Sequence, residues 1–358
     1  MSEIVKRIAI AGRTVGEGAP PFIIAEMSGN HNRDIDRALA IVDAAADAGA
    51  HAITLQTYTA DTLTLDIDRP EFVIDDAGSL WNRRTLYDLY EEAHTPWEWH
   101  RAIFERASAR NLICFSTPFD GSAVDFLEKL DAPAYKIASF ENTDLPLIRT
   151  VAATGKPVIL STGMASLDEI GEAVETIRSA GNDQIALLKC TSAYPADASH
   201  ANIATIVDIA ERYGVVAGVS DHTPGIGVAV AAVALGAAVV EKHFTLRRAD
   251  GGVDAAFSLE PSELAALVEE TDRAWRSVGG VSYGPTAGET ASLQFRRSLY
   301  VVADMKEGER FTRANLRSIR PGFGAAAKYL DEALGRRAVR DIRRGEPASR
   351  DMWGRGAS

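Results

Sequence analysis

The stretch GVVAGVSDHTPGIGVAVAAVALGAAVVEKHFT (214–245) contains the pattern that decides the fold. Two short apolar runs, VVAGVS (215–220) and AAVVEKH (237–243), enclose a longer segment that ends at Gly236. Runs that are apolar nearly throughout suit parallel strands buried on both faces, and the segment between them is long enough for a helical crossover. The stretch therefore predicts a β–α–β unit whose strands both end in polar side chains.

Six further runs of the same character precede this unit. They are FIIAE (22–26), HAITLQ (51–56), LICFS (112–116), AYKIA (134–138), PVILS (157–161) and QIALLKC (184–190). Segments with helical period separate them, as over 34–49, where Ile35, Leu39 and Val42 share one helix face. Eight strands with helical crossovers predict an α/β protein with a (β/α)₈ TIM barrel. The alternative is an open doubly wound sheet, but no G-x-G-x-x-G motif follows the first strand. The opening RIAIAGRTVG (7–16) predicts a hairpin that covers the barrel floor.

Composition excludes several classes of protein. With 46% hydrophobic and 25% charged residues, the 358-residue chain can form a sizeable core and is not wholly disordered. The sequence contains no run of 18 apolar residues of the kind that predicts a membrane span. Its first residues also lack an apolar signal core, so we expect a cytoplasmic protein. A net charge of −12 argues against nucleic acid as the main partner. Cys114 and Cys190 lie in apolar runs and are expected to be buried thiols.

The charge is unevenly distributed along the chain. Residues 291–358 carry 15 Lys and Arg against 8 Asp and Glu, a net of +7, which leaves −19 on the rest. The stretch 278–290, rich in Gly, Ser, Thr and Pro, has the composition of a linker. We therefore predict a barrel domain over 1–280 that includes the hairpin, a linker over 281–294 and a small basic domain over 295–358. The basic domain suits an acidic protein surface or an anionic substrate better than nucleic acid.

Every predicted strand ends in polar or ionisable groups. They are, in order, Glu26, Gln56, Ser116 with Thr117, Lys136 with Ser139, Ser161, Thr191 with Ser192, Ser220 with Asp221 and His222, and Glu241 with His243. Because the carboxyl ends of barrel strands meet on one rim, these side chains are predicted to converge there. Such convergence favours an enzyme.

His222 and His243 end successive strands and are therefore predicted neighbours on this rim. Two imidazoles suit a divalent metal ion with open positions for substrate oxygens; the alternative is that each ring is only a hydrogen-bonded rim histidine. Lys136, together with the rim hydroxyls, offers donors for an anion such as a small phosphorylated carboxylate. Glu26 is the candidate acid or base, and the metal and nearby cations are expected to keep it ionised.

Eight motifs follow one another along the predicted barrel: AEMSGNHN, LQTYTADTL, STPFD, YKIAS, STGMAS, KCTSAYPA, GVSDHT and EKHFT. In this order they resemble the sialic acid synthase family, which condenses phosphoenolpyruvate with an amino-sugar aldehyde. The segment RRSLYVVADMKEGERFTRANLRSIRPGFG resembles the small antifreeze-like (SAF, β-clip) domain of that family. TLYDLYEEAHTPWEWH, CTSAYPA and GGVDAAFSLEP look most like the pseudaminic acid synthase branch, and the resemblance covers essentially the whole chain.

The resemblance implies a role for each matching position. His222 and His243 match the family's metal ligands, with Mn²⁺ or Mg²⁺ as the ion, and Glu26 matches the glutamate near the reacting carbons. The positions that match the phosphoenolpyruvate pocket are Thr117, Lys136, Ser139, Ser161 and Ser220. The sugar-side or rim matches are Gln56, Tyr194 and Asp254, and Ser192 stands where sialic acid synthases proper often have Asn. Arg320 matches an arginine that reaches the neighbour's sugar in a domain-swapped homodimer.

The implied activity is a transferase reaction that joins phosphoenolpyruvate to a 6-deoxy-2,4-diacetamido hexose of the altrose type, giving pseudaminic acid and phosphate. N-acetylneuraminate and legionaminate synthases are the alternatives within the family. One position departs from the family pattern, because Thr54 stands where a lysine usually precedes the Gln of LQTY by two residues. A catalytically weakened homologue, or a binder without turnover, therefore stays open as another alternative.

Overall fold

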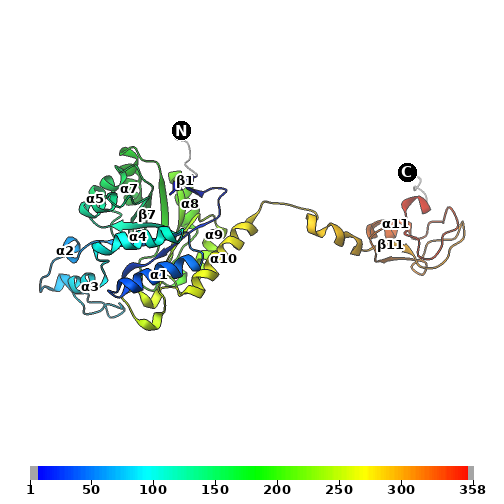
Figure 1. Ribbon diagram of the computed structural model, residues 1–358. Helices are drawn as coiled ribbons and strands as arrows, with labels where there is room; N and C mark the ends of the chain where they lie inside the picture. Colours follow the sequence, from blue (N-terminus) through cyan, green and yellow to red (C-terminus); the bar gives the residue numbers. More distant parts are fainter. Residues whose placement is uncertain (1–6, 354–358) are drawn as a thin grey trace. The chain divides into compact units, whose positions relative to one another are not determined.

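The computed structural model describes residues 7–353, which divide between Gly279 and Gly280 into two compact units (Figure 1). In the first unit eight parallel strands close into a barrel in the order β10-β3-β4-β5-β6-β7-β8-β9. The strands are β3 (Phe22–Glu26), β4 (Ala52–Thr57), β5 (Ile113–Pro118), β6 (Tyr135–Ile137), β7 (Val158–Ser161), β8 (Ile185–Cys190), β9 (Val216–Ser220) and β10 (Val239–His243). The predicted (β/α)₈ barrel is therefore confirmed, with a strand at each predicted position.

Helices surround the barrel and follow the strands in turn. They are α1 (Ile35–Asp47), α4 (His100–Ala109), α5 (Gly121–Glu128), α6 (Leu145–Ala152), α7 (Leu167–Ser179), α8 (Thr205–Tyr213), α9 (Gly227–Ala234) and α10 (Pro261–Val278). The long insertion after β4 adds α2 (Ala60–Leu63) and α3 (Leu86–Ala93). Local sequence explains where a helix begins: the Asp34 side chain accepts from the backbone of Asp36 and Arg37 at the start of α1. None of the helices in the described residues is long and apolar enough to cross a membrane.

Side chains alternate between the two faces of each strand and so build two apolar layers. Ile23, Ile53 and Leu160 pack outward against the helices, whereas Ile24 and Ile159 belong to a separate cluster inside the barrel. A hairpin of β1 (Arg7–Ile10) and β2 (Arg13–Gly16) adds Ile8, Ile10 and Val15 to this inner cluster. The predicted hairpin is therefore present and closes the barrel at its floor.

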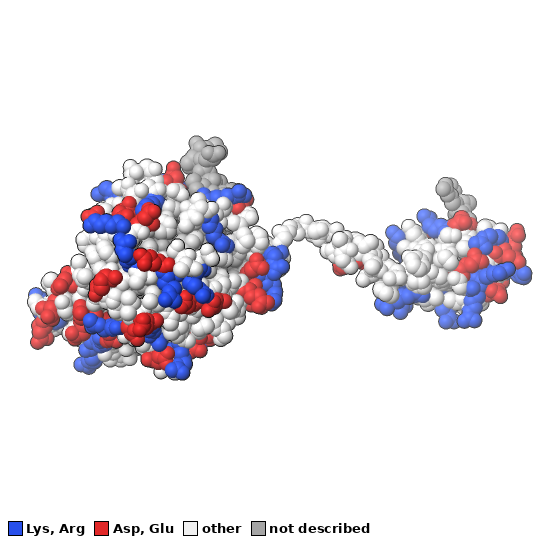
Figure 2. Space-filling view, viewed as in Figure 1, with Lys and Arg blue, Asp and Glu red and all other residues white. Residues whose placement is uncertain are grey.

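The second unit has a small core of its own. Its antiparallel strands β11 (Ser298–Val301) and β12 (Leu316–Ile319) pack with the short helix α11 (Leu330–Ala333). Basic and acidic side chains are interspersed on the faces of both units drawn in Figure 2. Cys114 and Cys190 are both buried free thiols, as predicted.

Candidate active site

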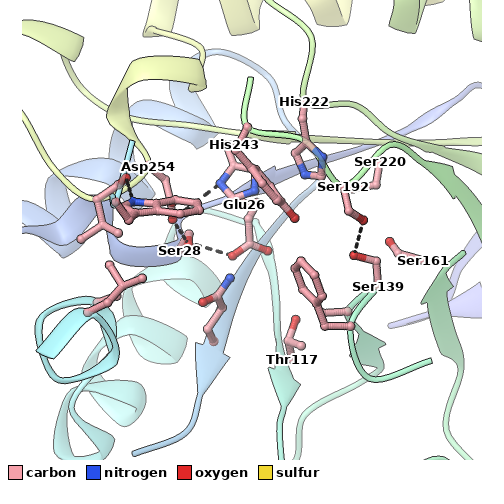
Figure 3. A pocket seen from close by; sticks show the side chains of 18 of the residues that line it. Glu26, Ser28, Thr117, Ser139, Ser161, Ser192, Ser220, His222, His243 and Asp254 are labelled. Carbon is pink, nitrogen blue, oxygen red and sulfur yellow. Dashed lines mark hydrogen bonds and ion pairs between the residues drawn. The ribbon is translucent and has the colours of Figure 1, made fainter. Parts of the chain in front are cut away.

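A cavity of about 730 Å³ opens among the carboxyl ends of the barrel strands. It is lined by the predicted site residues Glu26, Gln56, Thr117, Lys136, Ser139, Ser161, Ser192, Tyr194, Ser220, His222, His243 and Asp254, whereas three other strand-end groups that were predicted to converge there, Ser116, Thr191 and Asp221, do not line it. Figure 3 shows Glu26, His222 and His243 in this cavity. Alternation along the strands explains this convergence, because every second residue near a strand end points into the barrel. Arg320 lies in the second unit, just after β12, and its predicted contact with a sugar stays a prediction.

The two histidines lie next to each other at the ends of β9 and β10. Their ring centroids are 5.2 Å apart, and the Tyr194 ring lies 4.5 Å from that of His222. His222 Nδ1 is 2.9 Å from the Thr191 carbonyl oxygen, to which it can donate, so that its Nε2 stays available. His243 Nδ1 is buried without a hydrogen-bond partner among the described residues, 4.0 Å from a carboxylate oxygen of Asp254.

Burial and the neighbouring charges give the two rings different proton affinities. Burial lowers the pKa of His243 well below its usual value, and His222 and Lys136 lower it further. Burial also opposes protonation of His222, but Cys190 and the Thr191 carbonyl outweigh it and raise the pKa of that ring. A neutral His243 has the form that a metal ligand requires.

The residues present fit a divalent ion that has only two protein ligands and takes its other ligands from water and substrate. Among residues 7–353 no group of three or more His, Cys, Asp and Glu side chains is arranged to hold a metal. His222 Nε2 and the unpartnered His243 nevertheless provide two nitrogen donors on one wall of the cavity. Water and substrate oxygens would have to supply the remaining ligands, as is common for Mg²⁺ and Mn²⁺.

Glu26 lines the cavity at the end of β3, beside His243 in the strand register. One of its carboxylate oxygens accepts from the Ser28 backbone N–H at 3.0 Å. Burial raises the pKa of Glu26 well above its usual range, and the Glu241 carboxylate adds to this effect more than Lys136 offsets it. Without a bound ion, burial and a like charge therefore favour the protonated form of Glu26. The prediction that a metal ion and nearby cations together keep Glu26 ionised stays a prediction.

Two of the donors predicted for an anion meet at the Glu241 carboxylate. Lys136 Nζ lies 3.2 Å from a carboxylate oxygen of Glu241, and the Ser220 hydroxyl donates to the same oxygen at 2.8 Å. The Ser161 hydroxyl and the other Glu241 oxygen are buried and have no hydrogen-bond partner among the described residues. Buried polar atoms without partners are costly, so a ligand that bonds to them is favoured.

Several lining residues were not singled out as site residues from the sequence. The Ser28 hydroxyl bonds to Asp254, and burial raises the pKa of Glu141 to about 7. Both follow strands closely, so the strand-end rule could have found them. Trp81 comes from the insertion after β4; its indole N–H donates to the Val253 carbonyl at 3.0 Å, and its ring lies 5.7 Å from that of Tyr194. No local signal marks it, because only the folded insertion brings it over the cavity.

Thr54 is fully buried and does not line the cavity. It pairs with Glu26 in the register of β3 and β4, and alternation places it on the inner face of the barrel, two residues before Gln56. Within residues 7–353, Lys136 is the only Lys or Arg that lines the cavity, against five carboxylates: Glu26, Asp76, Glu141, Glu241 and Asp254. Thr54 adds no positive charge near the cavity, so Lys136 alone among the described lining residues offsets these carboxylates.

Comparison with known proteins agrees with this barrel and its rim. The sequence pattern of the NeuB family matches residues 41–283, and that of the SAF domain matches residues 296–352. The chain belongs to the NeuB family and is an enzyme of that family, with a C-terminal SAF domain. The resemblance inferred from the motifs is thereby confirmed.

Two relatives and one solved structure illustrate the similarity. The chain is 43% identical to a pseudaminic acid synthase from Campylobacter jejuni, over 91% of this chain and 94% of that protein. It is 40% identical to a pseudaminic acid synthase from Helicobacter pylori, over 93% and 97%. The crystal structure of an N-acetylneuraminic acid synthetase from Leptospira borgpetersenii, in complex with citrate, has a TM-score of 0.72 and 33% identity, and the match covers 83% of this chain and 98% of that one.

Proposed function

We propose that this protein is a pseudaminic acid synthase. It joins phosphoenolpyruvate to a 6-deoxy-2,4-diacetamido hexose of the altrose type and releases pseudaminic acid and phosphate, which makes it a transferase of nonulosonic acid biosynthesis. The observation that carries the proposal is the set of acid, imidazole, ammonium and hydroxyl groups around one cavity in a chain 40–43% identical to such synthases. A legionaminate synthase relative from Campylobacter jejuni is 34% identical, which makes that activity the second candidate.

The proposed reaction forms one carbon–carbon bond and breaks the bond between carbon 2 and the phosphate oxygen. Carbon 3 of phosphoenolpyruvate forms a bond to the aldehyde carbon of the sugar, and the aldehyde oxygen takes up a proton. Water adds to carbon 2 and loses a proton. The bond between carbon 2 and the phosphate oxygen then breaks, its electron pair leaves with phosphate, and the hydroxyl on carbon 2 gives its proton to the phosphate and becomes the keto group. The raised pKa of Glu26 suits a group that gives a proton to the aldehyde oxygen and regains one from water.

Phosphoenolpyruvate would lie between Lys136 and the rim hydroxyls. Ser161 can donate to a phosphate or carboxylate oxygen without breaking a bond, whereas Lys136 must be shared with Glu241. Gln56, Tyr194 and Asp254 line the same cavity and would contact the sugar. Since one lysine faces several carboxylates there, binding of such an anion needs further positive charge.

A divalent cation, Mn²⁺ or Mg²⁺, fits this need, and His222 and His243 would hold it. When bound, such an ion polarises a carbonyl oxygen and neutralises negative charge. We further propose a cytoplasmic homodimer in which Arg320 of the SAF domain contacts the sugar bound to the other copy. The mass of the protein in solution, and the sugar KM of an Arg320→Ala variant, test this part.

Phosphate release from phosphoenolpyruvate with Mn²⁺ tests the activity itself. The assay compares the altrose-type diacetamido sugar with N-acetylmannosamine and with the sugar that legionaminate synthases use. Release with the altrose-type sugar alone supports the proposal, and release with another sugar moves the protein to another branch. No release from a folded protein that binds Mn²⁺ favours the weakened homologue and directs attention to Thr54.

A further inference from the structure

Lys242 is a fully buried charged residue on the outer face of the barrel. It lies on β10 between Glu241 and His243, both of which line the cavity. Strand alternation turns Lys242 to the outer face of the barrel, where Val240 packs against the helices. Its side chain is 0% exposed, so its charge is removed from water, which is unfavourable unless the ammonium group finds partners.

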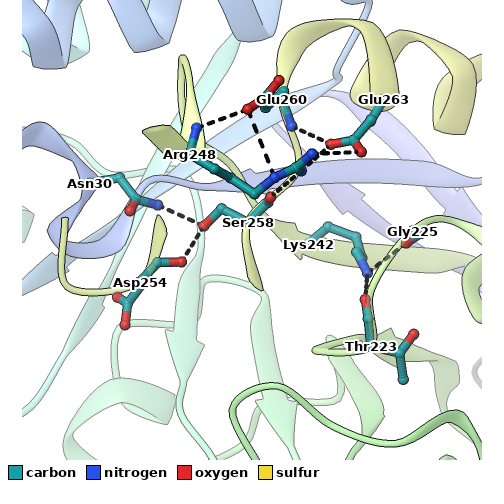
Figure 4. Close-up of polar contacts among 9 residues, drawn as sticks. All are labelled: Asn30, Thr223, Gly225, Lys242, Arg248, Asp254, Ser258, Glu260 and Glu263. Carbon is teal, nitrogen blue, oxygen red and sulfur yellow. Dashed lines mark hydrogen bonds and ion pairs between the residues drawn. The ribbon is translucent and has the colours of Figure 1, made fainter. Parts of the chain in front are cut away.

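The ammonium group finds three partners, all in one short segment. Nζ donates to the Thr223 carbonyl at 2.6 Å and to the Gly225 carbonyl at 2.9 Å (Figure 4). It also donates to a carboxylate oxygen of Asp221 at 3.1 Å. A lysine ammonium has three N–H donors, and all three are used here. The other Asp221 oxygen accepts from the Thr223 backbone N–H at 2.9 Å and from its hydroxyl at 2.8 Å. Three residues of the segment 221–225 therefore accept hydrogen bonds from the same buried ammonium group.

His222 belongs to this segment. Its backbone lies between Asp221 and Thr223, both held by Lys242, and its ring is held separately by the Thr191 carbonyl. His243 is the chain neighbour of Lys242 on β10. One side chain thus ties the segment that carries the first histidine to the strand that carries the second.

We propose that Lys242 is a positioning residue that sets His222 against His243 without touching the substrate. The inference rests on the proposed function in that the two rings are taken as the metal ligands. A buried ion pair by itself adds little stability compared with apolar residues of similar size, so stability alone is a weak reason for this charge. Groups that orient metal ligands, in contrast, commonly change metal affinity or activity about 10–100-fold when they are removed.

The test compares Lys242→Met with Lys156→Met in the full-length protein. Lys156 also forms an ion pair, with Glu128 at 2.7 Å, but it precedes β7 at the other end of the barrel. We expect Lys242→Met to weaken Mn²⁺ binding, measured from the electron paramagnetic resonance of the free ion, about 10–100-fold. We expect kcat to fall by a similar factor with little change in the KM for phosphoenolpyruvate, and Lys156→Met to behave like the unmodified protein.

A second readout does not depend on metal or turnover. In ¹⁵N-histidine-labelled protein, at a pH high enough for the His222 ring to be neutral, that ring should show one tautomer, with the proton on Nδ1. Lys242→Met should show exchange between forms. If that variant does not fold, Asp221→Asn/Lys242→Met removes both charges and should give the same changes. The inference would be overturned if Lys242→Met bound Mn²⁺ as tightly as the unmodified protein and left the His222 signal unchanged. A failure of the unmodified protein to bind Mn²⁺ would instead count against the proposed metal site, and the His222 signal would still decide the role of Lys242.

Discussion

The floor and the mouth of the barrel are built from the same eight strands and differ completely in character. Near the floor the inward side chains are apolar, as with Phe115 on β5 and Ile159 on β7, and they pack with the N-terminal hairpin. Two residues further along the same strands, Thr117 and Ser161 line the cavity. A strand therefore supplies core packing at one level and a polar site at the next, which separates stability from chemistry along its length.

The largest expected effect lies at the mouth. His243→Ala should reduce turnover by at least about 10²–10³-fold, the range seen when one charge-stabilising group is lost, because it removes one of two imidazole donors. The free energy of unfolding should change little, since His243 Nδ1 has no hydrogen-bond partner within residues 7–353 to lose. Phosphate release measures the turnover, and urea unfolding measures the free energy of unfolding. Full activity of the unmodified protein in metal-free buffer would contradict the assignment of His222 and His243 as metal ligands.

A substitution at the floor should have the opposite profile. Ile159→Ala removes a fully buried side chain from the inner cluster and should lower the free energy of unfolding by about 2–5 kcal/mol. The KM for phosphoenolpyruvate should stay close to that of the unmodified protein in the folded fraction. A large rise in this KM would show that packing at the floor and geometry at the mouth are coupled.

Ser161→Ala is the counterpart on the same strand. The Ser161 hydroxyl has no partner among the described residues, so its removal should leave the stability almost unchanged. If it donates to the substrate anion, the KM for phosphoenolpyruvate should rise by an amount equivalent to about 1.5–3 kcal/mol. Steady-state kinetics at several phosphoenolpyruvate concentrations would reveal an unchanged KM, which would remove Ser161 from the proposed anion site.

Glu26→Gln tests how strongly burial acts at the mouth. Because the folded-state pKa of Glu26 is raised, its contribution to stability is present below the pKa of the unfolded chain and is lost as the pH rises through the folded value. Gln cannot ionise, so the variant should gain stability relative to the unmodified protein between about pH 5 and pH 8. Urea midpoints at both pH values measure this, and a constant difference would mean that the carboxyl is not perturbed.

The smallest effect is expected above the cavity. Trp81→Phe retains an aromatic ring but loses the hydrogen bond to the Val253 carbonyl, which is worth about 1 kcal/mol. If this bond holds the insertion over the sugar, the sugar KM should rise about fivefold while the KM for phosphoenolpyruvate stays the same. An equal rise in the sugar KM and in the KM for phosphoenolpyruvate would indicate that the substitution disturbs the whole cavity and not the sugar side alone.

Most of the barrel and its site could be predicted because the signals are local. The apolar runs found all eight strands, and the strand-end rule placed Glu26, His222 and His243 in one cavity. The raised pKa of Glu26 in the protein without a bound ion was not predicted, because it depends on burial and on Glu241, which approaches from a different strand. Trp81 was missed because its place over the mouth depends on how the insertion folds.

The sequence by itself determined the alternation of strands and helices, the polar end of each strand and the membership of the chain in its family. These properties depend on residue types at short spacings, which hydrophobic periodicity and motifs record directly. Only the tertiary structure decided that Lys242 holds the His222 segment, that Lys136 is shared with Glu241 and that Glu26 has a raised pKa. Each of these depends on distances and burial among residues that are far apart in the chain, and barrel closure alone sets such distances.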